Sequence, residues 1–195
     1  MSRPRSGERR EEILQILARM LQESPGEHIT TAALAKSVGV SEAALYRHFP
    51  SKARMFESLI EFIEDSVFTR INRILAEPVG AADRIQQILV LVLGFADKNP
   101  GMARLLQGGV LTGETERLRE RIAQFYDRIE TALRQALRDE ALASGAGLAV
   151  NDTARLLLAL IEGRIAQFVR SDFKASPVAG WEEQWQILNA GMTKH

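Results

Sequence analysis

The sequence contains no cysteine, and it has no apolar run long enough to cross a membrane. Without disulfides the fold must depend on its own hydrophobic core, and a chain of 195 residues is large enough to form one. The longest apolar run, residues 88–95, is much shorter than the roughly 20 residues of a membrane-spanning helix. The basic first residues are not followed by the apolar stretch of a secretory signal. We therefore expect a cytoplasmic protein with no membrane partner.

Histidine is scarce as well, with His28, His48 and His195 lying far apart in the sequence. This distribution gives no catalytic pairing and no metal-ligand spacing. A glycine-rich phosphate-binding loop is also missing from the sequence. These absences argue against an enzyme, and we expect neither a metal nor a cofactor.

An excess of one charge sign is also lacking, because 25 basic residues balance 25 acidic ones. The basic and acidic residues are, however, distributed unequally along the sequence. Residues 1–55 carry nine Lys or Arg against six Asp or Glu, and the remainder carries sixteen against nineteen. A small basic segment on a larger acidic body is typical of a nucleic-acid reader. We predict a DNA-binding domain at residues 1–52 and a helical dimerisation and partner-binding domain at residues 53–195.

The apolar residues recur at three- and four-residue spacings throughout, which predicts an all-α fold. Apolar periodicity, capping residues and Pro or Gly breaks define about nine helices. In chain order these are residues 9–23, 31–38, 41–48, 51–75, 82–98, 102–107, 114–143, 152–171 and 181–191. Residues 144–150 are expected to form a loop.

Residues 30–49 have the pattern of a helix-turn-helix. Gly39 tolerates the positive φ that the turn requires, and Ala35 is small enough for two short helices to cross. Thr30 or Thr31 and Ser41 can cap the two helix starts. The buried wedge between the helices is expected to consist of Val38, Val40, Leu45 and Phe49.

The face of the second helix that points away from this wedge is polar, and we expect it to enter the major groove. Arg47 can bond guanine in a bidentate manner, Glu42 can accept from cytosine, and Ala43 can contact a thymine methyl group. Tyr46 and Lys52 suit phosphates, whereas His48 is as consistent with a capping role as with a DNA contact. The full set of predicted DNA-binding residues is Thr30, Thr31, Ser41, Glu42, Ala43, Ala44, Tyr46, Arg47, His48 and Lys52.

The segment at residues 152–171 is apolar on most of its circumference, which indicates a helix buried on two sides. A second copy of the chain is the simplest cover for the second side, and the last helix can complete a four-helix dimer bundle. Gly163 fits a close approach of two backbones there. The predicted interface residues are Leu157, Leu160, Ile161, Gly163, Phe168 and Trp185.

Residues 30–52, which end in Leu-Tyr-Arg-His-Phe-Pro-Ser-Lys, resemble the DNA-binding module of the tetracycline-repressor family. That resemblance implies an all-helical, dimeric fold with a variable C-terminal body. Residues 58–66, 94–101 and 168–174 resemble one member of the family that acts in cell division. The likeness departs at the N-terminus, at residues 108–115 and after residue 143.

The second likeness implies a nucleoid-associated protein that binds palindromic chromosomal sites, as one or two dimers per site. It further implies that the DNA-bound protein antagonises the tubulin-like division GTPase FtsZ by engaging its C-terminal tail. Phe62 on the fourth helix and a stripe on the fifth lie away from the core positions, which is compatible with a peptide groove. Packing of Phe62 and Leu91 inside the body is the other possibility. The predicted groove residues are Phe62, Arg70, Leu91, Gly94, Lys98 and Asn99.

A ligand-responsive transcriptional repressor is the alternative function, since that role is the commonest in the family. It requires a pocket with buried polar groups among apolar walls. The apolar stripes of the C-terminal body have few polar interruptions, which weakly favours a peptide-binding surface.

Overall fold

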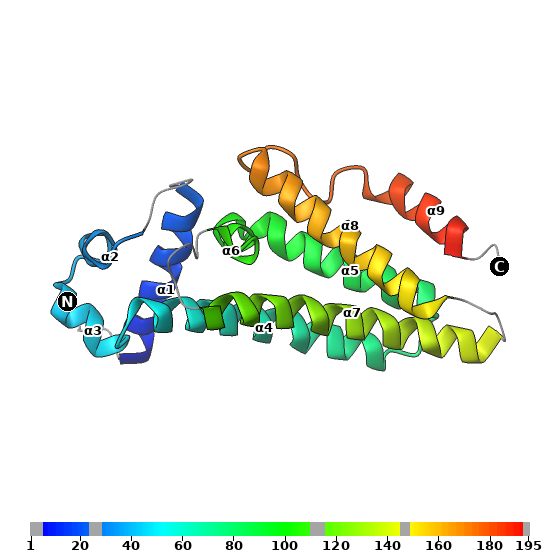
Figure 1. The fold of residues 1–195 in the computed structure, drawn as a ribbon, viewed down its shortest axis with the longest axis horizontal. Coiled ribbons are helices and arrows are strands. Elements are labelled where there is room, and N and C mark those ends of the chain that lie inside the picture. Colours follow the sequence, from blue (N-terminus) through cyan, green and yellow to red (C-terminus); the bar gives the residue numbers. More distant parts are fainter. Residues whose placement is uncertain (1–5, 24–28, 110–115, 145–148, 193–195) are drawn as a thin grey trace. The chain divides into compact units, whose positions relative to one another are not determined.

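The computed structural model describes residues 6–23, 29–109, 116–144 and 149–192, and all regular secondary structure in these ranges is helical (Figure 1). The helices are α1 (Ser6–Glu23), α2 (Thr31–Val38), α3 (Glu42–His48), α4 (Lys52–Ala76), α5 (Ala81–Lys98), α6 (Pro100–Leu106), α7 (Glu116–Ser144), α8 (Val150–Arg170) and α9 (Trp181–Met192). The predicted all-α fold is therefore confirmed. Among these described helices, none is long and apolar enough to cross a membrane.

Each predicted helix is present, although α1 begins at Ser6 and α8 at Val150, both earlier than predicted, and the start of α6 was wrong for an instructive reason. The sequence Asn99-Pro100-Gly101 suggested a break before a helix at residue 102, but α6 begins at Pro100. Proline is well tolerated in the first turn of a helix, because the amide that it lacks would have no helical partner there. The predicted start at Glu114 and most of the predicted loop at 144–150 lie outside the described residues.

The chain forms two compact units that are not contiguous in sequence. The first unit comprises residues 1–63 and 99–122, and the second comprises residues 64–98 and 123–195. Helix α6 therefore packs with the N-terminal helices, although α5 precedes it in the chain. The predicted division at residue 52 concerns function, and it remains a prediction.

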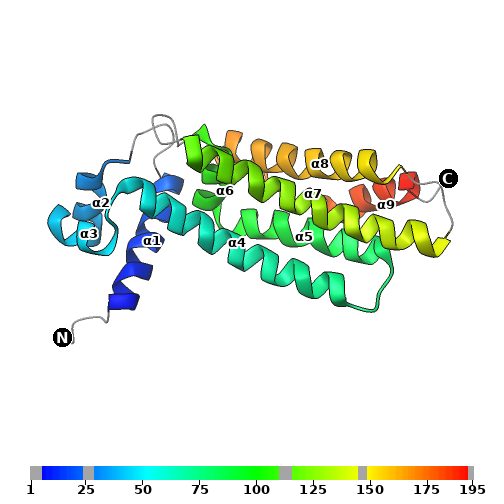
Figure 2. The same ribbon diagram turned by 60° about the horizontal axis from the view of Figure 1, so that its bottom comes forward.

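In the first unit, α6 lies directly against α1 (Figure 2). A Cβ atom added to Gly101 would lie 1.8 Å from the carbonyl oxygen of Ala18, so only glycine permits this approach. Arg104 is buried, and its guanidinium donates to the carbonyl oxygens of Leu21 at 2.8 Å and Gln22 at 3.2 Å. These carbonyls belong to the last turn of α1, where helical partners are missing. Helix α6 thus both packs against α1 and caps its end.

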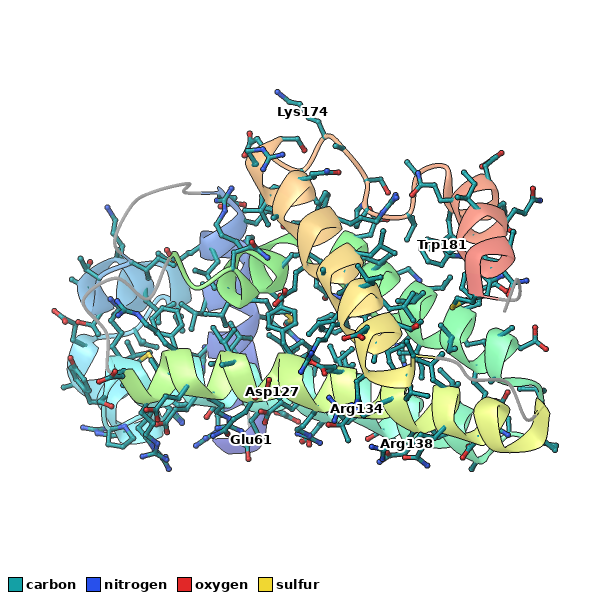
Figure 3. All side chains as sticks on the ribbon, turned by 45° about the vertical axis from the view of Figure 1, so that its right-hand side comes forward. Glu61, Asp127, Arg134, Arg138, Lys174 and Trp181 are labelled. Atoms are coloured by element: carbon teal, nitrogen blue, oxygen red, sulfur yellow. The ribbon has the colours of Figure 1, made fainter. Side chains whose placement is uncertain are left out.

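The second unit buries the apolar face of α5 against α8, which crosses it (Figure 1). Phe68 and Phe125 meet edge to face, with ring centroids 5.4 Å apart. The guanidinium of Arg128 lies 3.6 Å from the centroid of Phe68. Figure 3 shows Lys174 in the connection between α8 and α9, with its side chain pointing away from the helices, and Trp181 at the start of α9.

Arg164 fixes the connection between α8 and α9. It donates to the carbonyl oxygens of Pro177 at 2.6 Å and Ala179 at 2.7 Å, and it also bonds Gln184. Partial burial lowers the pKa of Arg164 from its ordinary value, but a guanidinium remains charged at neutral pH.

Candidate nucleic-acid interface

The turn between α2 and α3 has the geometry that the sequence predicted. Gly39 adopts the left-handed conformation, with φ 76° and ψ 34°. Its amide donates to the carbonyls of Ala35 and Lys36, which closes the end of α2. A residue with a side chain rarely adopts this φ, so glycine makes the sharp change of direction possible.

Two side-chain caps start the helices. Thr30 Oγ1 accepts a hydrogen bond from the amide of Ala33 at 3.1 Å, and Ser41 Oγ accepts one from the amide of Ala44 at 3.2 Å. Thr30 therefore caps α2, and this settles the choice between Thr30 and Thr31. Each cap satisfies one of the free amides of a helix start.

The wedge between the helices is buried as expected. Leu45 and Phe49 are fully buried, and Val38 and Ala35 are nearly so. Val40 is half-buried, so it contributes less than predicted. Burial of one side of α3 leaves its opposite side at the surface.

That opposite side carries the predicted DNA-contacting residues Glu42, Ala43, Tyr46 and Arg47, and all four are accessible. Glu42, Ala43 and Arg47 are exposed, and Tyr46 is 43% exposed. Thr31 joins this face from α2, because its hydroxyl donates to Glu42 Oε2 at 2.8 Å. The hydroxyl of Tyr46 in turn donates to Thr31 Oγ1 at 3.4 Å. These two hydrogen bonds, which no sequence pattern signals, link Glu42 and Tyr46 through Thr31.

Of the remaining predicted residues, Ala44 and His48 are half-buried on α3. Lys52 begins α4 and lies 5.7 Å from the centroid of Phe56. This distance is measured from the ammonium Nζ, which makes a cation–π contact with the ring at the start of α4.

The end of α3 is held by Arg10 of α1, which sequence periodicity did not single out. Its guanidinium donates to the carbonyl oxygen of His48 at 3.3 Å and to Ser58 Oγ at 2.9 Å. It also lies over the ring of Phe49, 4.4 Å from the centroid. Arg10 therefore links α1 to both α3 and α4.

The residues of the predicted peptide groove belong to both compact units. In the first unit, Phe62 is 48% exposed and Asn99 is half-buried. In the second unit, the accessible cations are Arg70 and Lys98, beside the half-buried Leu91 and Gly94. The exposure of Phe62 agrees with a side chain on the flank of α4. Assembly of these residues into one groove remains a prediction.

The predicted dimer residues fall into two groups. Leu157, Ile161, Phe168 and Trp185 are covered within the single chain, whereas Leu160 is half-buried and Gly163 is exposed. The first four therefore pack in the core of the protomer. Trp185 stacks on Trp181 of the same chain, with ring centroids 6.2 Å apart.

The exposed apolar side chains of α8 and α9 are different ones, namely Leu156 at 72% and Ile187 at 74%. They line an apolar groove of about 480 Å³ between these two helices, together with Leu160 and Leu188. This exposed surface is therefore a stronger candidate for contact with a second copy of the chain than the four predicted residues that lie in the core.

Within the described ranges, no group of three or more His, Asp or Glu residues could hold a metal ion. The accessible chemistry of the first unit is instead that of hydrogen-bond donors and acceptors on a short exposed helix. Such a face suits base edges in a DNA groove.

Comparison with known proteins agrees with this geometry. Residues 13–59 match the family model described as bacterial regulatory proteins of the tetR family. Residues 80–193 match the model described as the tetracyclin repressor-like C-terminal domain. The first match contains α2, the turn and α3, and the second covers most of the second unit.

Curated relatives are similar along nearly the whole chain. The nucleoid occlusion factor SlmA of Marinomonas sp. (strain MWYL1) is 59% identical over 186 residues, which are 94% of each chain. The nucleoid occlusion factor SlmA of Shewanella pealeana is 58% identical over 182 residues, or 92% of each chain.

Solved structures of low sequence identity share the fold. The fatty acid degradation regulator FadR of Bacillus halodurans has a TM-score of 0.81 at 15% identity, with both chains fully covered. FadR of Bacillus subtilis, solved with stearoyl-CoA, has a TM-score of 0.76 at 19% identity and covers 93% of this chain and 98% of its own. These two similarities concern the architecture alone.

Proposed function

The chain belongs to the tetracycline-repressor family, among the nucleoid occlusion factors SlmA, and from this membership we propose that it stops division-ring assembly over the nucleoid. It is a DNA-binding regulator and not an enzyme. The observation that carries the proposal is the 59% identity, which extends through the helix-turn-helix and through the C-terminal body alike. The corresponding cellular location is the cytoplasm, where the protein is bound to the nucleoid.

DNA recognition uses the exposed side of α3. The exposed side of a recognition helix meets base edges in the major groove, while the flanking residues hold phosphates. Arg47 donates to guanine, Glu42 accepts from cytosine, and Ala43 contacts a thymine methyl group. Thr30, Thr31, Ser41, Tyr46 and Lys52 surround them and hold the backbone of the duplex.

Palindromic sites require two copies of this reader, and a homodimer supplies them. The exposed apolar surface of α8 and α9 supports a dimer in which Leu156 and Ile187 become buried. A site can then take one dimer or two.

The partner of the DNA-bound protein is FtsZ, which is engaged through its C-terminal tail. Phe62, Leu91 and Gly94 offer apolar contacts, and Arg70, Lys98 and Asn99 offer polar ones. The exposed cations Arg70 and Lys98 suit an acidic peptide. DNA binding determines the chromosomal positions at which the protein acts.

Charge reversal at Lys98 tests the partner assignment. Lys98→Glu is expected to leave the affinity for a selected palindromic duplex unchanged, because Lys98 is not among the DNA-reading residues. The same variant is expected to lose its effect on GTP-dependent FtsZ assembly, measured by sedimentation of polymer.

Lys174→Glu is the matched control, since it reverses an exposed charge of the same unit in the connection between α8 and α9. It should retain both properties. If DNA-bound Lys98→Glu acts on FtsZ like the wild type, the peptide site is assigned to the wrong residues.

A further inference from the structure

The recognition helix is short, and at its C-terminal end the amide of Phe49 donates to the carbonyl of Leu45. Helix α3 has seven residues, and Phe49 follows it in an extended conformation with φ −138° and ψ 112°. Carbonyl groups in the last turn of a helix lack helical partners, so the end of α3 needs support from elsewhere.

Arg10 provides that support with a planar group that makes three contacts at once. Two are hydrogen bonds, to the carbonyl oxygen of His48 and to Ser58 Oγ, and the third is the stacking over Phe49. His48 is the last residue of α3, and Ser58 lies in the second turn of α4. A cation beside helix C-terminal carbonyls is also favourable with respect to the helix dipole.

We propose that Arg10 is a positioning residue for sequence recognition, which fixes the orientation of α3 without itself contacting a base. Phe49 is fully buried, so the ring under the guanidinium has a fixed position. The orientation of Arg10 therefore defines where the last turn of α3, with Tyr46 and Arg47, lies relative to α1 and α4. The inference rests on the proposed DNA binding.

A basic residue near a DNA reader has an obvious other role, which is to neutralise a phosphate. The two roles predict different measurements. A phosphate contact strengthens binding to every duplex and adds about 0.9 to the slope of log affinity against log salt. A positioning residue strengthens binding to the specific duplex and leaves the salt slope and the non-specific affinity unchanged.

The variant Arg10→Lys distinguishes the two roles, because lysine keeps the positive charge but lacks the planar guanidinium group. A single ammonium group cannot cover the Phe49 ring and hold both oxygen acceptors in the arginine geometry. Arg10→Lys should therefore lose as much specific affinity as Arg10→Gln, on the order of ten-fold, the size expected for hydrogen bonds of a charged group.

The experiment uses the full-length chain and two duplexes of equal length and composition. One is a palindrome selected from random duplexes with the wild-type protein, and the other is its scrambled version. Affinities for both are measured over a series of salt concentrations for Arg10→Lys, Arg10→Gln and Arg19→Gln. Arg19→Gln removes an exposed arginine from the same helix and should leave the ratio of specific to non-specific affinity unchanged.

Ser58→Ala tests the same contacts with a milder change that keeps all charges and the buried ring. It should lower the specific affinity about three-fold through one lost hydrogen bond. Combined with Arg10→Lys, it should add little, because both changes remove the same contact. Circular dichroism melts identify any variant that has lost its fold. If the Arg10 variants are unfolded, the specific affinity of Ser58→Ala decides whether Arg10 has the positioning role.

The outcomes separate clearly. The positioning role is overturned if Arg10→Lys matches the wild type, if Arg10→Gln lowers the salt slope and weakens both duplexes equally, or if Ser58→Ala leaves the specific affinity unchanged. If selection with the wild-type protein recovers no duplex, the proposed function fails, and that result is distinct from a failure of the Arg10 assignment.

Discussion

Arg47 is exposed on the outer side of α3, one residue from Tyr46 and on the face opposite the buried Leu45. If it bonds guanine in the major groove, Arg47→Ala should cost roughly 1 to 3 kcal/mol of specific binding free energy and relax the base preference at one position. Titration against the selected palindrome and its single-base variants measures both effects. Unchanged binding would show that α3 is not placed in the groove as described.

If Glu42 reads a base as proposed, Thr31 affects recognition through it, because the Thr31 hydroxyl donates to one carboxylate oxygen of Glu42 at 2.8 Å. Thr31→Val keeps the volume and removes the donor. The carboxylate then loses its fixed direction, so discrimination at the base pair that Glu42 reads should fall by about 1 kcal/mol, the value of one hydrogen bond. Binding to a series of duplexes substituted at that position tests this expectation, and equal discrimination in both proteins would contradict it.

At the scale of residues, the sequence predicted the features that depend on near neighbours. The caps at Thr30 and Ser41 and the left-handed Gly39 are local, so a short stretch of sequence determines them. The contacts of Arg10 with His48 and Ser58 join residues 38 and 48 positions apart. No periodicity within α1 signals them, since an exposed arginine has the same sequence pattern whether or not it binds another helix.

Among the elements, α6 is the one whose role the sequence left hidden. Its Pro100-Gly101 start has the composition of a loop, and only packing against α1 shows why glycine is needed there. Gly101→Ala should lower the free energy of unfolding by about 3 kcal/mol, because the added Cβ meets backbone rather than a flexible side chain. Chemical denaturation of the full-length chain measures the change.

Gly94→Ala is the matched control for this prediction. Gly94 lies within α5, and a Cβ atom there would have nothing within 4 Å. Alanine is the better helix former, so Gly94→Ala should raise stability by up to about 1 kcal/mol. Equal stability of the two variants would mean that α6 does not approach α1 as closely as described.

For the whole molecule, the central feature is the exposed apolar surface of α8 and α9. If this surface forms the proposed dimer interface, Leu156→Glu should give a monomer of 21.7 kDa in sedimentation velocity, because burying a carboxylate at an interface is costly. Affinity for a palindrome should fall with it. Gln135→Glu, an exposed change on α7, should leave the dimer intact. A dimeric Leu156→Glu protein would place the interface elsewhere.

The sequence predicted that α8 is apolar nearly all round, but it could not divide those residues between core and interface. Leu157 and Ile161 are covered by their own chain, while Leu156, one position away, is 72% exposed. Both environments select the same apolar residue types, so periodicity gives one broad stripe. The three-dimensional packing of α5 against α8 decides which side of that stripe remains open.

In the proposed function, DNA binding turns this chain into an inhibitor of FtsZ assembly. The most direct measurement is GTP-dependent FtsZ polymer, quantified by sedimentation, in the presence of the wild-type chain with either the selected palindrome or its scrambled version. Polymer should decrease strongly with the palindrome and remain near the protein-free level with the scrambled duplex. Equal polymer with both duplexes would contradict the account.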